Sequence, residues 1–274
     1  MNKLLFLFLL LLAQHTFAQN TATTRPFTIG VIDSLPSKLL GETRTLNIYL
    51  PAGYGQDPKV TYPVIYLLDG GADEDFIHIA GLVQYFNFPW INRFPESIVV
   101  GIANTNRKRD FTYAVPNLDF LKPMGFDKST FPAYGGSATF INFIEKELQP
   151  YIAGHYHIAP GKTLIGQSLG GLLATEILLK KTSLFDTYIL ISPSLWWGNE
   201  SLLRQKPQAG KPKVYLAIGN EGTPMVPDAK QLAAWLKQNN IPVVFDYLGN
   251  EDHATIGHQA VMNAFRQLYP APKQ

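Results

Sequence analysis

Short apolar runs separated by longer segments of helical periodicity recur along this chain. Uninterrupted apolar runs predict strands that are buried on both faces, and they cover residues 62–68, 97–103, 163–165, 187–192, 213–219 and 243–248. Apolar residues at helical spacing predict helices over residues 76–88, 137–151, 172–178, 228–239 and 254–268. Strands that alternate with helices indicate an α/β fold, with a mostly parallel central sheet and helices on both faces.

Two stretches depart from this pattern. Residues 27–32 and 43–50 alternate between apolar and polar positions, which predicts half-buried antiparallel strands at the N-terminal edge of the sheet. Residues 104–136 are rich in Pro, Gly, Arg and aromatic side chains and show no regular period. Because a long irregular segment in a domain is usually functional, we expect this one to lie near the site.

The first residues carry a third pattern. Lys3 precedes an apolar run from Leu4 to Ala13, and small residues at Thr16 and Ala18 follow it. A basic start, a short apolar core and a small-x-small end are typical of a secretory signal, and the run is too short to span a membrane. We expect residues 1–18 to be a cleaved signal peptide and residues 19–274 to form a single domain. The mature protein is then periplasmic or secreted, without a membrane contact.

Composition narrows the function classes. The 274 residues include 46% hydrophobic side chains, which is enough for one large core. With 23 basic and 21 acidic residues, the formal charge of +2 is too balanced to indicate nucleic acid as a partner. The chain has no cysteine, which excludes disulfides, thiolate metal sites and a cysteine nucleophile. The oligomeric state does not follow from the sequence.

One motif joins a predicted strand to a predicted helix. Gly166-Gln-Ser168-Leu-Gly170 follows the strand 163–165 and has the G-x-S-x-G pattern of a nucleophile elbow. In such a turn, strained backbone lifts the serine hydroxyl out of the sheet, and the two glycines leave room where a Cβ would collide. Ser168 is therefore the candidate nucleophile.

A serine hydroxyl attacks only when a base takes its proton. Where this motif serves catalysis, an acid and then a histidine follow the serine along the chain. His253 follows the last predicted strand and is the candidate base, whereas His258 falls inside the closing helix. Glu221, two residues beyond a predicted strand, is the candidate acid. Asp228 is its rival, although an aspartate at a helix start is often an N-cap, and a Ser–His dyad without an acid is the third alternative.

The reaction also needs backbone amides. Two N–H groups must stabilise the oxyanion that forms on the attacked carbonyl. We expect one from Leu169, directly after the nucleophile, and one from Gly71, in the loop after the strand 62–68. All these candidates follow predicted strands, and the carboxyl ends of parallel strands meet at one edge of a sheet.

Two groups of residues are candidates for binding the substrate. Arg107, Lys108 and Arg109 follow the strand 97–103, where Arg107 and Arg109 can bind an anionic group, with a solvated basic loop as the alternative. Trp196 and Trp197 follow the strand 187–192 and can form a pocket wall, with ordinary packing as the alternative.

The chain resembles the putative esterase family of α/β-hydrolases over most of its length. The resemblance rests on Tyr66-Leu-Leu-Asp-Gly70, Val100-Gly-Ile-Ala-Asn104, Gly166-Gln-Ser-Leu-Gly-Gly171, Ser192-Pro-Ser-Leu-Trp-Trp197 and Glu251-Asp-His253. That family includes enterochelin-type siderophore esterases, feruloyl and acetyl xylan esterases, S-formylglutathione hydrolases and mycolyltransferases. The Ser192–Trp197 stretch and His253 are most similar to the siderophore-esterase branch. The resemblance implies a Ser–His pair with a variable acid, ester cleavage without a metal or cofactor, and no large lid domain.

The sequence thus predicts an exported serine esterase that cleaves a siderophore-, feruloyl- or acetyl-type ester through an acyl-enzyme. The substrate is expected to be a small-molecule or glycan-linked ester. Two alternatives stay open. One is an acyltransferase of the same fold, and the other is a non-catalytic module that binds a glycan or a siderophore.

Overall fold

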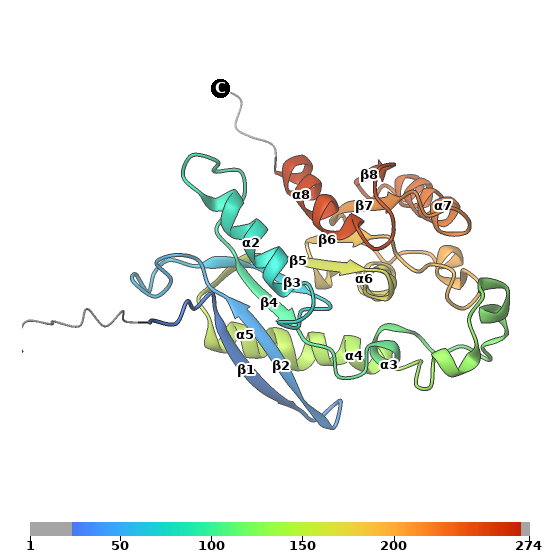
Figure 1. Ribbon diagram of the computed structural model, residues 1–274, viewed down its shortest axis with the longest axis horizontal. Helices are drawn as coiled ribbons and strands as arrows, with labels where there is room; N and C mark the ends of the chain where they lie inside the picture. Colours follow the sequence, from blue (N-terminus) through green and yellow to red (C-terminus); the bar gives the residue numbers. More distant parts are fainter. Residues whose placement is uncertain (1–23, 270–274) are drawn as a thin grey trace, which may run out of the picture.

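A single eight-stranded sheet organises the residues that the computed structural model describes, 24–269 (Figure 1). The strand order is β1-β2-β4-β3-β5-β6-β7-β8. The strands are β1 (Val31–Ser37), β2 (Glu42–Tyr49), β3 (Tyr62–Leu67), β4 (Ile98–Ile102), β5 (Ile158–Gln167), β6 (Thr187–Ile191), β7 (Lys213–Gly219) and β8 (Val243–Leu248). β1 and β2 pair antiparallel and β2 joins β4 antiparallel, while all other pairs are parallel. The predicted mostly parallel sheet with an antiparallel N-terminal edge is confirmed. The predicted signal peptide lies outside the described residues.

The first strand is the one that the alternation pattern misplaced. The prediction over residues 27–32 was wrong, because β1 begins at Val31 and runs to Ser37. The strand is fixed by its register with β2, from Val31 opposite Ile48 to Ser37 opposite Glu42, rather than by its own weak pattern. Pro36 lies inside it, which a strand at the edge of the sheet tolerates because its outer amides need no partner.

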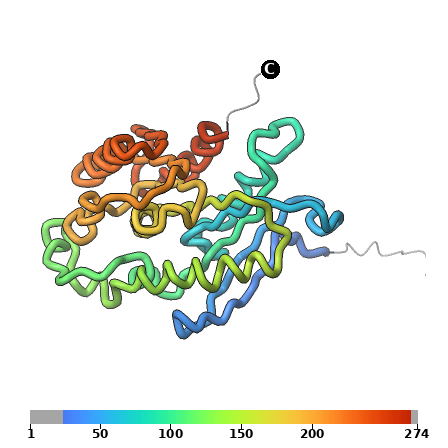
Figure 2. Tube along the Cα trace, turned by 180° about the vertical axis from the view of Figure 1, so that it is seen from behind, coloured from blue at the N-terminus to red at the C-terminus, as the bar shows by residue number. Residues whose placement is uncertain are grey.

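Helices cover both faces of the sheet, as predicted. They are α2 (Phe76–Asn87), α3 (Arg107–Phe111), α4 (Ser137–Phe143), α5 (Gln149–His155), α6 (Leu169–Lys180), α7 (Met225–Gln238) and α8 (Ile256–Leu268). α2 and α8 lie side by side on one face and share a buried cluster, whereas α4, α5, α6 and α7 contribute to the cluster on the other face (Figure 1). Residues 144–148 between α4 and α5 form a π-helix. Residues 137–155 therefore make one continuous helical segment, yellow-green in Figure 2.

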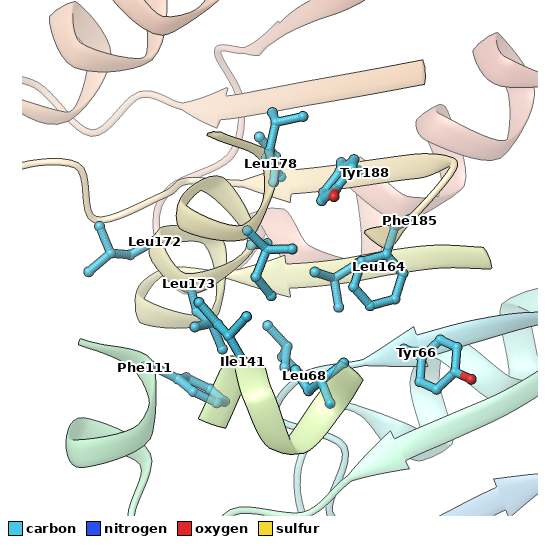
Figure 3. Packing of buried hydrophobic residues seen from close by; sticks show 14 of the residues in the cluster. Tyr66, Leu68, Phe111, Ile141, Leu164, Leu172, Leu173, Leu178, Phe185 and Tyr188 are labelled. Atoms are coloured by element: carbon cyan, nitrogen blue, oxygen red, sulfur yellow. The ribbon is translucent and has the colours of Figure 1, made fainter. Parts of the chain in front are cut away.

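The core on the α6 face is built from large apolar side chains. Figure 3 shows Leu164 and Tyr188 on neighbouring strands with Leu178 of α6 above them, while Leu173 lies beside Phe111 and Ile141. Every residue of α6 from Leu169 to Leu179 is buried. Because α6 is buried along this length, its packing determines where the residue directly before it lies.

The irregular segment 104–136 lies on the same side as α6. It contains α3 and short 3₁₀ turns at Asp119–Met124 and Lys128–Thr130. Its start, directly after β4, brings α3 against α4 and α6. Within residues 24–269, no helix has the length and apolar character needed to cross a bilayer.

Candidate active site

Ser168 stands at the turn between β5 and α6. Its backbone has φ +58° and ψ −119°, a conformation that ordinary residues avoid. The Ser168 N–H donates to the carbonyl of Ile191 at 3.0 Å, and the Ser168 carbonyl accepts from the N–H of Ser194 at 3.0 Å. A Cβ on Gly166 would lie 2.4 Å from the carbonyl oxygen of Gly170, so the turn closes only around a glycine. The strained serine is therefore held by its surroundings rather than by its own preference.

The structure brings His253 and Glu221 to this serine. His253 Nε2 lies 3.0 Å from Ser168 Oγ, and His253 Nδ1 lies 2.5 Å from Glu221 Oε2. A carboxylate only accepts hydrogen bonds, so the ring proton of the neutral imidazole belongs on Nδ1. Nε2 then carries the lone pair and accepts from the serine hydroxyl. This arrangement can take the proton of Ser168 when the oxygen attacks.

Glu221 is held from three sides. Its Oε2 faces His253, and its Oε1 accepts from the Ser192 hydroxyl and from the Gly219 N–H. Burial alone would raise the pKa of Glu221, but the hydrogen bonds from His253 and Ser192 outweigh burial, so the pKa lies below its usual value. Glu221 is therefore charged at neutral pH and can stabilise a protonated His253.

The rival acid, Asp228, lies elsewhere. It is the fourth residue of α7, only 4% exposed, and no hydrogen bond joins it to His253 within the described residues. Burial, with Glu200 nearby, raises its pKa to about 6. It is not the N-cap of the helix, a position that Pro224 occupies. The geometry thus favours Glu221 over Asp228.

The two expected oxyanion donors differ in the free protein. The Leu169 N–H is at the first position of α6, where a helix offers its amides no internal partner. The Gly71 N–H donates to Glu74 Oε2 at 2.6 Å, and the Glu74 N–H donates back to the Gly71 carbonyl. This reciprocal pairing resembles a capping box. The Gly71 amide is therefore already occupied, which the sequence pattern did not indicate.

A cavity of about 530 Å³ opens beside Ser168, within the range of small-molecule sites. Its walls come from the loop after β3, from α2, from α3, from the elbow and from α8. Polar groups that line it beside Ser168 and His253 are Asp69, Glu74, Asp75, His78, Arg107, Gln167, Thr255 and His258. Apolar strand ends, among them Leu68, Ile165 and Ile191, form the rest.

The three basic residues that were expected near the substrate, Arg107, Lys108 and Arg109, bind different partners in the structure. Arg107 lines the cavity, but its guanidinium holds both oxygens of Asp69, at 2.6 and 2.8 Å. Arg109 does not line it, because its side chain is bound by Asp110 and Glu42. Lys108 donates to the carbonyl of Thr130. Of the three, only Arg107 is placed to affect a ligand in the cavity.

The two tryptophans lie outside this cavity as well. Trp197 is fully buried and donates its indole N–H to the carbonyl of Tyr113. Trp196 is 9% exposed and stacks on Phe126. Neither lines the cavity beside Ser168, so packing of the segment 104–136 explains both side chains.

Several polar residues at the site were not expected. Ser192 binds the acid, and Gln167 Nε2 donates to the His253 carbonyl at 2.9 Å. Ser194 places its hydroxyl 3.4 Å from that of Ser168. Gln167 is part of the elbow motif, and both serines belong to the Ser192–Trp197 stretch. The motifs therefore drew attention to these residues, but the sequence did not indicate which groups they would bind. Within residues 24–269, no three His, Asp or Glu side chains are arranged to hold a metal ion.

Comparison with known proteins identifies the family of the chain. A family model described as "Putative esterase" matches residues 37–268. Ferri-bacillibactin esterase BesA of Bacillus subtilis is 32% identical over 206 residues, which cover 70% of this chain and 68% of the relative.

Solved structures extend the likeness to the fold. The BES protein from Bacillus cereus has a TM-score of 0.78 and 29% identity, and the match covers 91% of this chain and 99% of that one. An IroE-like serine hydrolase from Shewanella oneidensis has a TM-score of 0.74 and 30% identity, covering 89% and 82%. The chain belongs to the putative esterase family, has the α/β-hydrolase fold and is a carboxylic ester hydrolase.

Proposed function

We propose that the chain is a serine esterase in which Ser168, His253 and Glu221 act together. The observation that carries this proposal is the continuous line of contacts from Ser168 Oγ through the imidazole to Glu221. The serine oxygen attacks the ester carbonyl while its proton moves to His253 Nε2. That proton then passes to the leaving alcohol, and the acyl group stays on Ser168.

Deacylation repeats these steps with water. His253 takes a proton from a water molecule, the hydroxide attacks the acyl carbonyl, and the serine recovers its proton as the acid product leaves. The Leu169 N–H supports the oxyanion in both steps. The Gly71 N–H joins it once the Glu74 carboxylate moves aside. Glu221 stays charged throughout and stabilises the imidazolium.

The substrate we propose is a small-molecule ester of the siderophore type. Support comes from the relative named as a ferri-bacillibactin esterase and from the size of the cavity, which suits one small ligand or a segment of a larger one. Feruloyl and acetyl esters are the other chemical classes to compare. A panel that spans acetyl, longer acyl, feruloyl and catecholate-lactone esters ranks them by kcat/KM.

We also propose that the protein is exported. The support is the basic start, apolar run and small-x-small end within residues 1–18. Mass spectrometry of the mature protein, isolated from separated cell fractions and medium, is expected to show an N-terminus at Gln19. An intact Met1 on protein found with the cytosol would contradict it.

The test of the mechanism compares Ser168→Ala with Ser183→Ala, a change at an exposed serine. We expect Ser168→Ala to lower kcat for p-nitrophenyl butyrate by about 10³-fold or more, and Ser183→Ala to leave it unchanged. A fluorophosphonate probe is expected to label the wild type at Ser168 only. Equal rates in wild type and Ser168→Ala would remove this serine from the mechanism.

A further inference from the structure

The carboxylates of the active-site cavity are not equivalent. Asp69, Glu74 and Asp75 all line it, and one guanidinium, that of Arg107, lies among them. Arg107 is bound to both oxygens of Asp69, which also accepts from Asn104 at 2.6 Å. Asp69 is therefore fully engaged and its charge is compensated.

Glu74 is engaged too, although by neutral groups. One of its oxygens accepts from the Gly71 N–H and the other from Asn104 Nδ2, each at 2.6 Å. These bonds hold the side chain but do not cancel its charge. Glu74 thus places a negative charge in the cavity that Ser168 also lines.

Asp75 differs from both. It directly precedes α2, yet its side chain does not cap that helix, and within the described residues it forms no hydrogen bond or ion pair. The residue is half-buried and lines the cavity. Burial and the neighbouring charges of Asp69 and Glu74 raise its pKa, while His78 and Arg107 lower it. Arg107 and His78 thus act on Asp75 from a distance, but within the described residues neither forms an ion pair with it.

We infer that Asp75 selects substrates that carry a positive charge near the ester, and that the cavity disfavours substrates with a free carboxylate. This inference rests on the proposed function of Ser168. The charged and titratable side chains that act on Asp75 are Asp69, Glu74, His78 and Arg107. His258 of α8 lines the same cavity. Because Arg107 is committed to Asp69, a cationic group on the ligand is the partner that the unpaired carboxylate lacks.

The experiment uses isosteric ester pairs. One pair is p-nitrophenyl caproate ending in trimethylammonium or in tert-butyl, and the other is butyrylcholine and its tert-butyl isostere, so both ends of the ester are tested. We expect the wild type to prefer the charged member of at least one pair by about tenfold in kcat/KM. Asp75→Asn is expected to bring that ratio close to one, mainly through KM. A caproate chain ending in carboxylate is expected to be the poorest substrate.

Asp73→Asn is the matched control, because Asp73 is exposed on the same loop and does not line the cavity. It is expected to keep the wild-type ratio. A wild-type ratio below about threefold in both pairs, or a ratio that Asp75→Asn changes by less than about threefold, would overturn the inference.

Two further measurements test the charge preference, one without the Asp75→Asn variant and one without hydrolysis of the ester. The wild-type ratio is expected to fall as salt rises from about 10 mM to about 300 mM, because screening weakens the attraction between charges. A ratio that salt does not move would count against Asp75 even if Asp75→Asn fails to fold. Calorimetric binding of the same pairs to Ser168→Ala tests the charge preference without catalysis. Absence of hydrolysis by the wild type would contradict the proposed function alone.

Discussion

In the free protein, the amide of Gly71 is bonded to the carboxylate of Glu74 at 2.6 Å. Gly71 is also the residue expected to complete the oxyanion site with Leu169. A carboxylate at this position competes with the oxyanion for the same N–H, and its charge repels the charge that develops on the substrate. If Gly71 serves as the second oxyanion donor, as we propose, binding of the ester includes displacement of Glu74.

Replacing Glu74 tests this competition. We expect Glu74→Gln to raise kcat for p-nitrophenyl acetate by about threefold to tenfold, because a neutral amide holds Gly71 less tightly and carries no opposing charge. Steady-state kinetics with Asp73→Asn as the control measure the effect. If kcat falls instead, the Gly71–Glu74 pairing is needed to shape the loop, and the amide is not released during the reaction.

The choice between the two candidate acids is also testable. We expect Glu221→Ala to lower kcat by about 10²-fold to 10⁴-fold, since His253 then loses the group that fixes its tautomer and stabilises its charge. Asp228→Asn is expected to keep kcat near the wild-type value. Single-turnover rates on a p-nitrophenyl ester distinguish them, and the opposite ranking would assign the acid to Asp228.

Asp228 should instead affect stability in a pH-dependent way. Its pKa is raised from 3.8 to about 6 in the folded protein, so between these values the folded state binds more protons than the unfolded state. The free energy of unfolding therefore falls as pH rises through this window. Above about pH 6 Asp228 is ionised in the folded protein, and the full destabilisation from its buried charge is present. We expect Asp228→Asn to be more stable than wild type at about pH 7.5, by about 2 kcal/mol, and the gain to vanish near pH 4.

Urea denaturation at both pH values measures that difference in the free energy of unfolding. Asp228 is a suitable residue for this test because it is only 4% exposed and one of its carboxylate oxygens has no partner within the described residues. A gain of equal size at both pH values would show that burial of the charge is not the cause.

A second stability prediction concerns the ion pairs that fix the segment 104–136. Arg44 of β2 and Asp110 of α3 are each 1% exposed and directly bonded, and Arg109 and Glu42 extend the group. We expect Asp110→Asn to lower the free energy of unfolding by about 3–5 kcal/mol, because it leaves Arg44 buried with reduced compensation. The exposed pair Asp119–Lys128 supplies the control, since Asp119→Asn should leave the urea midpoint unchanged. Equal midpoints for both variants would contradict this role.

Most of the fold, and the order in which the candidate site residues follow one another, could be predicted from the sequence. Uninterrupted apolar strands and a G-x-S-x-G turn are local patterns, and parallel strands bring whatever follows them to one edge. This is why Ser168, Glu221 and His253, far apart in the chain, lie within hydrogen-bonding distance. The strand predictions over 213–219 and 243–248 match β7 and β8.

Contacts that depend on three-dimensional partners were not predictable. The first strand was misplaced because its register is set by β2. Arg109 was expected at the cavity, yet Glu42, distant in sequence, binds it elsewhere. The capture of the Gly71 amide by Glu74 is a local turn that no periodicity reveals. Charge and motif identify which residues are available, but only their neighbours decide what each one binds.

The bond from the Gln167 side chain to the His253 carbonyl helps to hold the active-site segments together when no substrate is bound. The loop that carries the base is largely open to water, with 47% of the His253 side chain exposed. This bond ties the loop to Gln167, the residue directly before Ser168, so a single contact links the segments that carry the proposed base and the proposed nucleophile. The proposed base and nucleophile thus already lie within hydrogen-bonding distance in the free protein, while the Gly71 amide is still bonded to Glu74.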